Sequence, residues 1–291
     1  MMIGWNGSIK LQEEAVISVY DHGFLYGMGL FETFRTYGGE PYLLERHLER
    51  LSAGCESLGI KCKLDTGELR SWLRELMAAN GLEEAYVRLT VTAGEGVLGL
   101  PTGDYEEPNV LLLVKALPEP NDDLYLNGRE LALLRTLRNT PEGEVRLKSL
   151  HYMNNIIAKR ELAAIGWAAS GTEGLMLTRE GWLSEGIVSN LFFASGGKVF
   201  TPDIETGILP GITRQRVMEL AREAGITVEE GFYTWAELSE AEEVWVTNSI
   251  QELVPVTVLR DDDGCRTVIG SGQAGSITRK LLAAYREDTH L

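Results

Sequence analysis

Alternating apolar and polar side chains predict strands in the first third of the chain. Residues 3–5 and 8–11 flank the pair Asn6-Gly7, which is typical of a tight hairpin turn. Three further segments show the alternation or the short apolar run of a strand, over residues 29–37, 86–93 and 110–116. The first of these places Phe31 and Arg35 on one face.

Two segments of the same region show helical spacing instead. The first is predicted over residues 43–59, where apolar side chains recur at Leu44, Leu48, Leu51 and Leu58. The second is predicted over residues 66–80. Asp65 or Thr66 can cap its start, and Gly81 follows its end.

A polar stretch without periodicity, Pro118-Glu-Pro-Asn-Asp-Asp123, interrupts this pattern. We interpret residues 118–124 as a connector between an N-terminal domain (1–117) and a C-terminal domain (125–291). In the second domain the pattern predicts strands over 129–134, 174–178, 190–195 and 244–248, and helices over 153–165, 213–224, 235–240 and 276–287. Because strands and helices are interspersed without a regular βα repeat, we expect a mixed α/β (α+β) protein of two domains.

Composition narrows the functional classes. The 291 residues are 44% hydrophobic, which is enough for a sizeable core, and the formal net charge of −16 makes nucleic acid an improbable partner. No apolar run reaches the length of a membrane span, and the first residues lack the pattern of a signal peptide. Three cysteines without a CxxC pair and four scattered histidines predict a cytoplasmic protein with reduced thiols and no metal site.

Two motifs are better explained by structure than by function. Residues 94–99 match GxGxxG, but Pro101 and Pro108 follow where a dinucleotide fold would need a helix, so we predict a loop. The acid-rich residues 229–243 are typical of a solvated helix face.

A candidate anion site lies at Leu209-Pro210-Gly211-Ile212-Thr213-Arg214. Gly211 frees the turn, Thr213 can cap, and an amphipathic run follows. The N-terminus of such a helix offers unpaired N–H groups and the positive end of its dipole, which suits a phosphate. A plain capped helix is the alternative.

Lys148 and Glu185 are candidate reactive groups. Lys148 lies between Leu147 and Ser149, near two arginines (Arg138 and Arg146) in the sequence. A lysine with a lowered pKa can attack an aldehyde to form a Schiff base. Glu185 stands among small and apolar residues, where a carboxylate needs a cationic partner such as a protonated pyridine nitrogen. A surface lysine and a turn glutamate are the alternatives.

The order and spacing of these segments resemble the fold-type IV (class IV) pyridoxal-phosphate enzymes. These include branched-chain and D-amino-acid aminotransferases and 4-amino-4-deoxychorismate lyases. The resemblance runs nearly end to end, and within the family it is greatest to the lyases. Its main motifs are Asp21-His22-Gly23, Phe31-Glu32-Thr33-Phe34-Arg35, His47-Leu48-Glu49-Arg50-Leu51, Arg138-Asn139-Thr140-Pro141-Glu142-Gly143, Ser184-Glu185-Gly186 and Thr247-Asn248-Ser249.

The resemblance implies pyridoxal 5'-phosphate as the cofactor. Lys148 matches the lysine that holds it covalently, and Glu185 matches the acid on its pyridine nitrogen. The positions that match contacts to its phosphate or its ring are Arg50, Ile212, Thr213, Ser249 and Tyr152. The family fold would be a small α/β domain and a larger one with a pseudo-barrel sheet, with the cofactor between them in a homodimer.

Four further residues bear on the substrate. Asn248 stands where aminotransferases usually have a small residue, and Thr33 matches a substrate-side position of the lyases. Arg35 and Arg88 can supply charge for a dianionic small molecule. We therefore expect conversion of 4-amino-4-deoxychorismate to 4-aminobenzoate, a folate precursor, and pyruvate. Transamination of D-amino or branched-chain amino acids is one alternative, and a non-catalytic cofactor-binding protein is a second.

Overall fold

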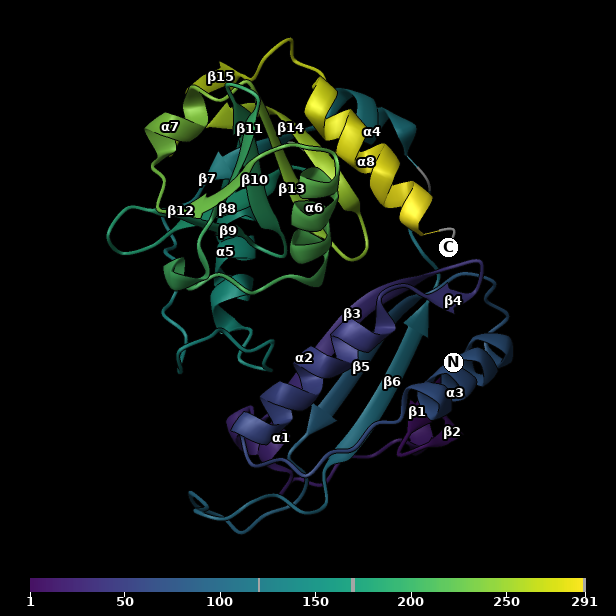
Figure 1. Cartoon of the computed structure of the whole chain (residues 1–291). Helices are drawn as coiled ribbons and strands as arrows, with labels where there is room; N and C mark the ends of the chain where they lie inside the picture. Colours follow the sequence, from purple (N-terminus) through teal and green to yellow (C-terminus); the bar gives the residue numbers. More distant parts are fainter. Residues whose placement is uncertain (120, 169–170, 290–291) are drawn as a thin grey trace. The chain divides into compact units, whose positions relative to one another are not determined.

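The computed structural model describes residues 1–119, 121–168 and 171–289 (Figure 1). Within these residues the chain forms two compact units. The first comprises Met1–Glu119 together with Leu147–His151, and the second comprises residues 121–146 and the described part of 152–289.

The first unit is built on a six-stranded antiparallel sheet in the order β2-β1-β6-β5-β3-β4. Its strands are β1 (Met2–Trp5), β2 (Ser8–Leu11), β3 (Gly29–Tyr37), β4 (Glu40–Pro41), β5 (Tyr86–Thr92) and β6 (Asn109–Lys115). The predicted hairpin is confirmed, because β1 and β2 pair and both Asn6 and Gly7 have positive φ, as a two-residue turn requires. The other three predicted strands are confirmed within one residue.

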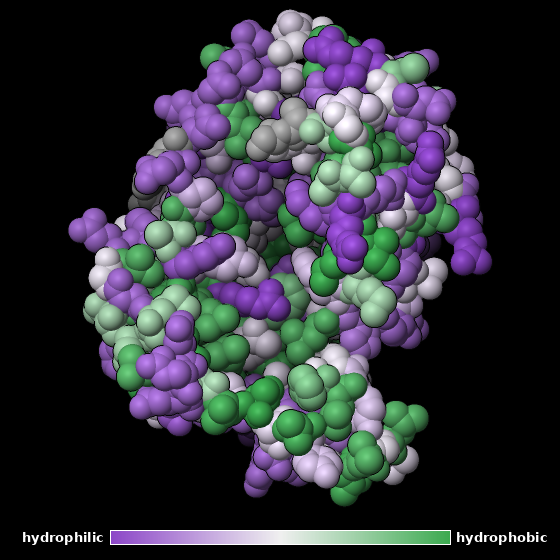
Figure 2. Space-filling model, turned by 180° about the vertical axis from the view of Figure 1, so that it is seen from behind, coloured by the Kyte–Doolittle hydropathy of each residue, from purple (hydrophilic) through white to green (hydrophobic). Residues whose placement is uncertain are grey.

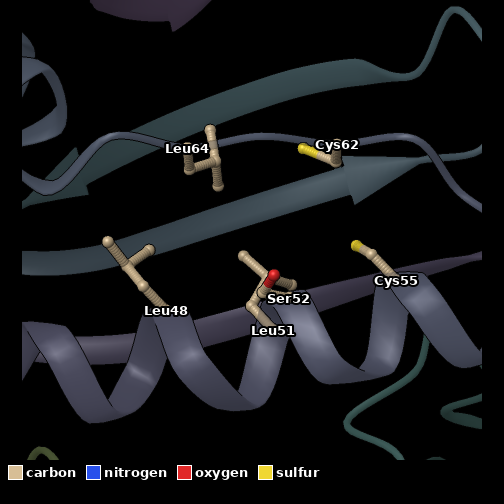
Figure 3. A pocket seen from close by; sticks show the side chains of 6 residues that line it. All are labelled: Leu48, Leu51, Ser52, Cys55, Cys62 and Leu64. Carbon is tan, nitrogen blue, oxygen red and sulfur yellow. The ribbon is translucent and has the colours of Figure 1, made fainter.

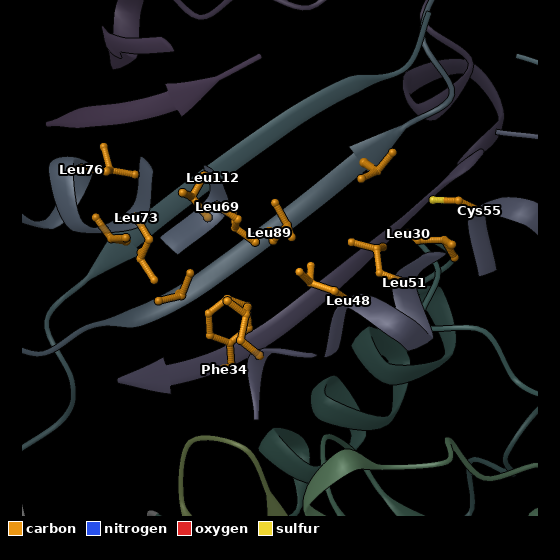
Figure 4. Close-up of a cluster of buried hydrophobic side chains, with 14 of the residues drawn as sticks. Leu30, Phe34, Leu48, Leu51, Cys55, Leu69, Leu73, Leu76, Leu89 and Leu112 are labelled. Carbon is orange, nitrogen blue, oxygen red and sulfur yellow. The ribbon is translucent and has the colours of Figure 1, made fainter. Parts of the chain in front are cut away.

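The two predicted helices are confirmed as α2 (Leu44–Ser57) and α3 (Thr66–Ala79), and both pack on this sheet. The short α1 (His22–Tyr26) and the 3-10 turn η1 (Gln12–Glu14) precede them in the sequence. The Asp65 carboxylate caps α3 by accepting from the Glu68 N–H at 2.9 Å. The apolar side chains of α2, α3, β3, β5 and β6 form one buried cluster (Figure 4). Its members include Leu30, Phe34, Leu48, Leu51, Leu73, Leu76, Leu89 and Leu112.

The second unit is built on a mixed nine-stranded sheet in the order β12-β11-β10-β13-β14-β7-β8-β9, with β15 paired to β14. The strands are β7 (Arg129–Leu133), β8 (Glu173–Leu177), β9 (Leu183–Gly186), β10 (Asn190–Ser195), β11 (Lys198–Pro202), β12 (Val228–Gly231), β13 (Glu243–Asn248), β14 (Glu252–Arg260) and β15 (Arg266–Val268). The Leu183 N–H at the β9 edge donates to the Tyr233 carbonyl, just beyond β12, at 2.7 Å. The sheet therefore curls into the pseudo-barrel that the resemblance implies.

Helices of the second unit are α4 (Asp122–Asn127), α5 (Met153–Ala164), α6 (Ile212–Glu223), α7 (Trp235–Ser239) and α8 (Ser276–Asp288), with the 3-10 turn η2 (Ile204–Thr206). The four predicted helices are confirmed, each within one residue at either end. Inside the curled sheet, buried side chains of β7, β8, β10, β13 and β14 form the core, including Leu131, Leu175, Leu191, Val246 and Val254.

The segment interpreted as the connector includes the start of a helix: the Asn121 side chain accepts from the Leu124 N–H at 3.2 Å and starts α4, while residue 120 lies outside the described residues. The predicted helix face over 229–243 is wrong at both ends, where Glu229 lies in β12 and the Glu243 carboxylate accepts from the first N–H groups of α8. Strand β14 was not predicted, and it contains Pro255, which cannot donate to a sheet.

Residues 94–99 lie in the loop between β5 and β6, as predicted. In the described part of the chain, no helix combines the length and hydrophobicity needed to cross a membrane. The three cysteines are thiols, and the described residues include no cluster of three or more His, Cys, Asp or Glu suited to a metal ion.

Two of these thiols face each other in a small pocket of the first unit, between α2 and the segment that follows it (Figure 3). The pocket is lined by Cys55 and Cys62 together with Leu48, Leu51, Ser52 and Leu64. The hydrogen bond between the two thiols, together with burial, raises the pKa of Cys55. The same hydrogen bond lowers the pKa of Cys62.

Candidate active site

The segment that carries Lys148 pairs with the start of β3. The Phe31 N–H donates to the Lys148 carbonyl at 2.9 Å, and the Leu150 N–H donates to the Gly29 carbonyl at 3.0 Å. Residues 147–151 therefore belong to the first unit. The Lys148 Nζ atom lies 4.8 Å from the centre of the Phe31 ring.

Arg50 lies on α2 and is held by a buried carboxylate of β3. Its Nε and Nη2 groups donate to Glu32 Oε1 and Oε2 at 2.8 and 2.7 Å. His47, one turn earlier on the same helix, contacts Glu32 Oε2 through Nδ1 at 2.6 Å. Glu32 and His47 are each 1% exposed and Arg50 is partly buried, so the three side chains form one polar group around a buried carboxylate.

The charges within this group follow from its surroundings. Burial alone would raise the pKa of Glu32, but the charge of Arg50 and the hydrogen bonds from His47 and Arg50 lower it to about 2. Burial lowers the pKa of His47, and the charges of Arg50 and Lys148 add to this effect against the pull of Glu32. At neutral pH the group is therefore an anionic carboxylate between a cationic guanidinium and a neutral imidazole that donates from Nδ1.

Three of the substrate-side candidates share one face of the first sheet. Thr33 on β3 is directly opposite Arg88 on β5, and Arg35 follows Thr33 on the same face. The Arg88 guanidinium carbon lies 3.7 Å from the centre of the Phe31 ring, and that of Arg35 lies 4.4 Å from the centre of the Tyr37 ring. This sheet face thus presents two cations stacked on aromatic rings.

In the second unit Glu185 lies in β9, and its buried carboxylate is surrounded by donors. Its Oε1 atom accepts from Arg138 Nε at 2.8 Å, and its Oε2 atom accepts from Asn190 Nδ2 at 3.2 Å and the Leu209 N–H at 3.0 Å. Arg146 Nε lies 3.9 Å from the same carboxylate, and burial lowers the pKa of Arg146 to about 10, so it remains a cation. Arg138 and Arg146, considered as neighbours of Lys148 in the sequence, thus both contact Glu185.

The start of α6 has the features of an anion site. Its N-cap is Gly211, no side chain caps its first N–H groups, and its first turn contains no acidic residue. The buried Thr213 hydroxyl lies 3.3 Å from the Ser249 hydroxyl. A Cβ atom on residue 211 would lie 2.0 Å from Asn190 Oδ1, so any other side chain there would displace the Asn190 amide.

The two remaining candidates are Asn248 and Tyr152. Asn248 ends β13, and its Oδ1 atom accepts from the backbone N–H groups of Ile250 and Gln251 at 3.0 and 2.8 Å. Its amide nitrogen is therefore the end that can donate to a ligand. Tyr152 is the residue immediately before α5.

Sequence reasoning did not assign roles to Glu32 and Asn190, which organise the two groups. Glu32 had one usable signal: it shares its strand face with Leu30 and Phe34, so an acidic side chain occupies a core-facing position. Asn190 had no signal, because its partners at Glu185 and Leu209 are brought to it only by the fold.

Residues 29–259 match the family model described as amino-transferase class IV. The chain belongs to the class IV aminotransferase family. It is 38% identical over 289 residues to the aminodeoxychorismate lyase of Bacillus subtilis, covering 99% of this chain and 94% of that one. It is 35% identical over 291 residues to a putative branched-chain-amino-acid aminotransferase of Methanocaldococcus jannaschii, covering 99% and 96%.

Solved structures of the family share the fold. The crystal structure of 4-amino-4-deoxychorismate lyase from Pseudomonas aeruginosa matches with a TM-score of 0.83 at 32% identity, covering 98% of each chain. The class IV family depends on pyridoxal 5'-phosphate.

The donor sets of both units fit this cofactor. A phosphate suits the uncapped start of α6 with its two hydroxyls, and it also suits a guanidinium such as that of Arg50. A protonated pyridine nitrogen suits the buried Glu185 carboxylate, and an aldehyde suits a lysine amine such as that of Lys148.

Proposed function

We propose that this chain is an aminodeoxychorismate lyase, which converts 4-amino-4-deoxychorismate to 4-aminobenzoate and pyruvate. The observation that carries this proposal is the 38% identity to the Bacillus subtilis lyase over 99% of the chain. Asn248 and Thr33, the two lyase-like positions of the sequence, agree with it.

Residues from both units have a role in holding the cofactor. Lys148 binds it covalently, and Arg50 binds its phosphate. Glu185 pairs with the pyridine nitrogen. Phosphate or ring contacts come also from Ile212, Thr213, Ser249 and Tyr152. This assignment is supported by the uncapped start of α6 and by the ring of donors around the Glu185 carboxylate.

The substrate is an anion with two carboxylates, and Arg35, Arg88 and Thr33 share one sheet face where they can bind it. The Asn248 amide nitrogen is a further donor for a carboxylate or enolpyruvyl oxygen. Stacking on Phe31 and Tyr37 limits the motion of the two arginines and so favours binding in one orientation.

Lys148 acts as the general base and removes the proton from the amino-bearing carbon of the substrate. The bound cofactor supplies an electron sink for the pair that this proton leaves behind. The carbon–oxygen bond to the enolpyruvyl group then breaks, and its electron pair leaves with the oxygen. Protonation of the released enolpyruvate gives pyruvate, and the ring becomes aromatic, so no outside oxidant or reductant is needed.

A two-well assay on purified protein with pyridoxal phosphate tests this function. One well contains enzymatically generated aminodeoxychorismate and is followed for 4-aminobenzoate and pyruvate. The other contains D-alanine or L-leucine with 2-oxoglutarate. Turnover that is much faster in the first well than in the second supports the lyase. No product in the first well, together with turnover in the second, contradicts it.

Transamination is the second candidate, because the Methanocaldococcus jannaschii relative named as a putative aminotransferase is 35% identical over the whole chain. In that case D-alanine or L-leucine alone converts the bound cofactor to its amine form, which absorbs at a different wavelength. The cofactor residues would keep their roles, and those of Asn248 and Thr33 in substrate binding would be withdrawn.

A second copy of the chain is the partner that the first unit favours. Large apolar side chains are exposed on residues 16–24 and on the loop between β5 and β6, where Val97 is 76% exposed and Leu100 88%. Figure 2 shows hydrophobic side chains gathered at the lower edge of its view. Burying such a patch favours association, so we expect twice the 32.2 kDa chain mass by light scattering. Free thiols favour a cytoplasmic location.

A further inference from the structure

We propose that Glu32 and His47 are positioning residues that fix the guanidinium of Arg50 for a phosphate monoester. The inference rests on the proposed role of Arg50 in binding the cofactor phosphate. It adds a buried carboxylate and a neutral imidazole, neither of which touches the ligand, to the residues that determine phosphate affinity.

The geometry of the pair carries the argument. Glu32 takes the Nε and Nη2 edge of Arg50 in two parallel hydrogen bonds of 2.8 and 2.7 Å. A bidentate carboxylate fixes both the plane of a guanidinium and its rotation about the last side-chain bond. Glu32 therefore sets the direction in which the rest of the Arg50 guanidinium lies.

His47 fixes the carboxylate in turn. Its Nδ1–H donates to Glu32 Oε2 at 2.6 Å, so that this oxygen receives two donors and the carboxylate cannot rotate without breaking one of them. The imidazole itself packs on Phe34 with ring centres 5.2 Å apart. His47 and Arg50 lie three residues apart on α2, so both reach Glu32 from the same helix face.

The position of Glu32 argues against a merely structural role. Its neighbours on the same strand face, Leu30 and Phe34, belong to the apolar core, and an apolar side chain at residue 32 would pack there without the cost of burying a charge. A buried ion pair contributes little net stability over such a replacement. What the carboxylate adds is a fixed orientation of Arg50, which a flexible arginine would otherwise have to adopt on binding.

The test compares two ligands that differ only in the phosphate. Protein freed of cofactor is titrated with pyridoxal 5'-phosphate and with pyridoxal, and binding is followed by absorbance. In Glu32→Gln the new amide offers one acceptor and places a donor against the N–H groups of Arg50 or His47. We expect about tenfold weaker binding of pyridoxal 5'-phosphate and unchanged binding of pyridoxal.

Glu84→Gln is the matched control. Glu84 is a partly buried carboxylate of the same unit that accepts from the Gly38 N–H and the Thr36 hydroxyl rather than from Arg50 or His47. We expect this variant to bind both ligands as the wild type does. In an Arg50→Ala background, Glu32→Gln should have no further effect, because its influence passes through the arginine.

The outcomes separate this inference from the proposed function. Wild-type protein that does not respond to pyridoxal 5'-phosphate contradicts the cofactor assignment. The positioning role is overturned if the wild type binds pyridoxal 5'-phosphate more tightly than pyridoxal and Glu32→Gln binds pyridoxal 5'-phosphate as tightly as the wild type or more tightly. If Glu32→Gln does not fold, His47→Leu is the second variant, because it keeps the ion pair between Glu32 and Arg50. It should weaken binding of pyridoxal 5'-phosphate by about threefold and leave binding of pyridoxal unchanged. An equal loss of affinity for both ligands would also overturn the positioning role.

Discussion

Asn190 and Glu185 face each other across the turn between β9 and β10, and Asn190 Nδ2 donates to Glu185 Oε2 at 3.2 Å. The same amide nitrogen donates to the Leu209 carbonyl at 2.9 Å, and the Leu209 N–H returns to Glu185 at 3.0 Å. The acid proposed for the pyridine nitrogen and the turn proposed for the phosphate are therefore held by one side chain. Changes at either place should disturb both.

Gly211→Ala should weaken binding of pyridoxal 5'-phosphate by at least about tenfold, because the new Cβ would lie 2.0 Å from Asn190 Oδ1 and displace it. A cofactor titration by absorbance measures this effect. Gly166→Ala is the control, since nothing lies within 4 Å of a Cβ at that position and its φ is not positive. Unchanged affinity in Gly211→Ala would show that the turn does not contact the cofactor.

Arg138→Met should destabilise the protein by about 3 kcal/mol, because it leaves the buried Glu185 carboxylate without its nearest cation. Urea unfolding of the cofactor-free protein measures the change. The double variant Arg138→Met/Glu185→Gln should regain most of that stability without regaining activity. If the single variant is as stable as the wild type, Arg138 does not compensate the carboxylate.

Acid should destabilise the wild type more than Glu32→Gln. The pKa of Glu32 is lowered from 4.5 to about 2 in the folded protein, so its stabilising contribution is present above pH 4.5 and is lost as the pH falls toward 2. Unfolding free energies measured across this window should converge for the two proteins. Parallel curves would mean that Glu32 titrates alike in the folded and unfolded chain.

The three thiols should react with a disulfide reagent at different rates. Cys265 is exposed and should react first, whereas Cys55 is buried and its raised pKa disfavours the thiolate, so it should react last. Stopped-flow absorbance with Cys265→Ser should lose the fastest phase alone. Retention of that phase would show that another thiol is more accessible in solution.

Local patterns predicted the elements that depend on local physics. The Asn6-Gly7 hairpin, strand β3 and the Asp65-capped helix α3 each follow from turn chemistry, alternation or a cap within a few residues. Strand β14 was not predicted. It contains Pro255, and its pairing with β13, β7 and β15 joins it to segments that are distant in the sequence as well as near ones.

The sequence likewise predicted only part of the candidate site. Sequence resemblance named Lys148, Arg50 and Glu185, but it did not predict that residues 147–151 pair with β3, because that pairing joins positions more than a hundred residues apart. Nor did it show that Glu32 fixes Arg50, since a hydrogen bond between a strand and a helix has no signature in local sequence.

Release of pyruvate by the wild type and by Lys148→Ala tests the central claim most directly. Both proteins receive pyridoxal 5'-phosphate and aminodeoxychorismate, and 4-aminobenzoate is measured in parallel. Lys198→Ala, which removes a surface lysine paired with Glu229, is the matched control. We predict equal amounts of the two products from the wild type and the control and none from Lys148→Ala; full pyruvate release by Lys148→Ala would contradict the account.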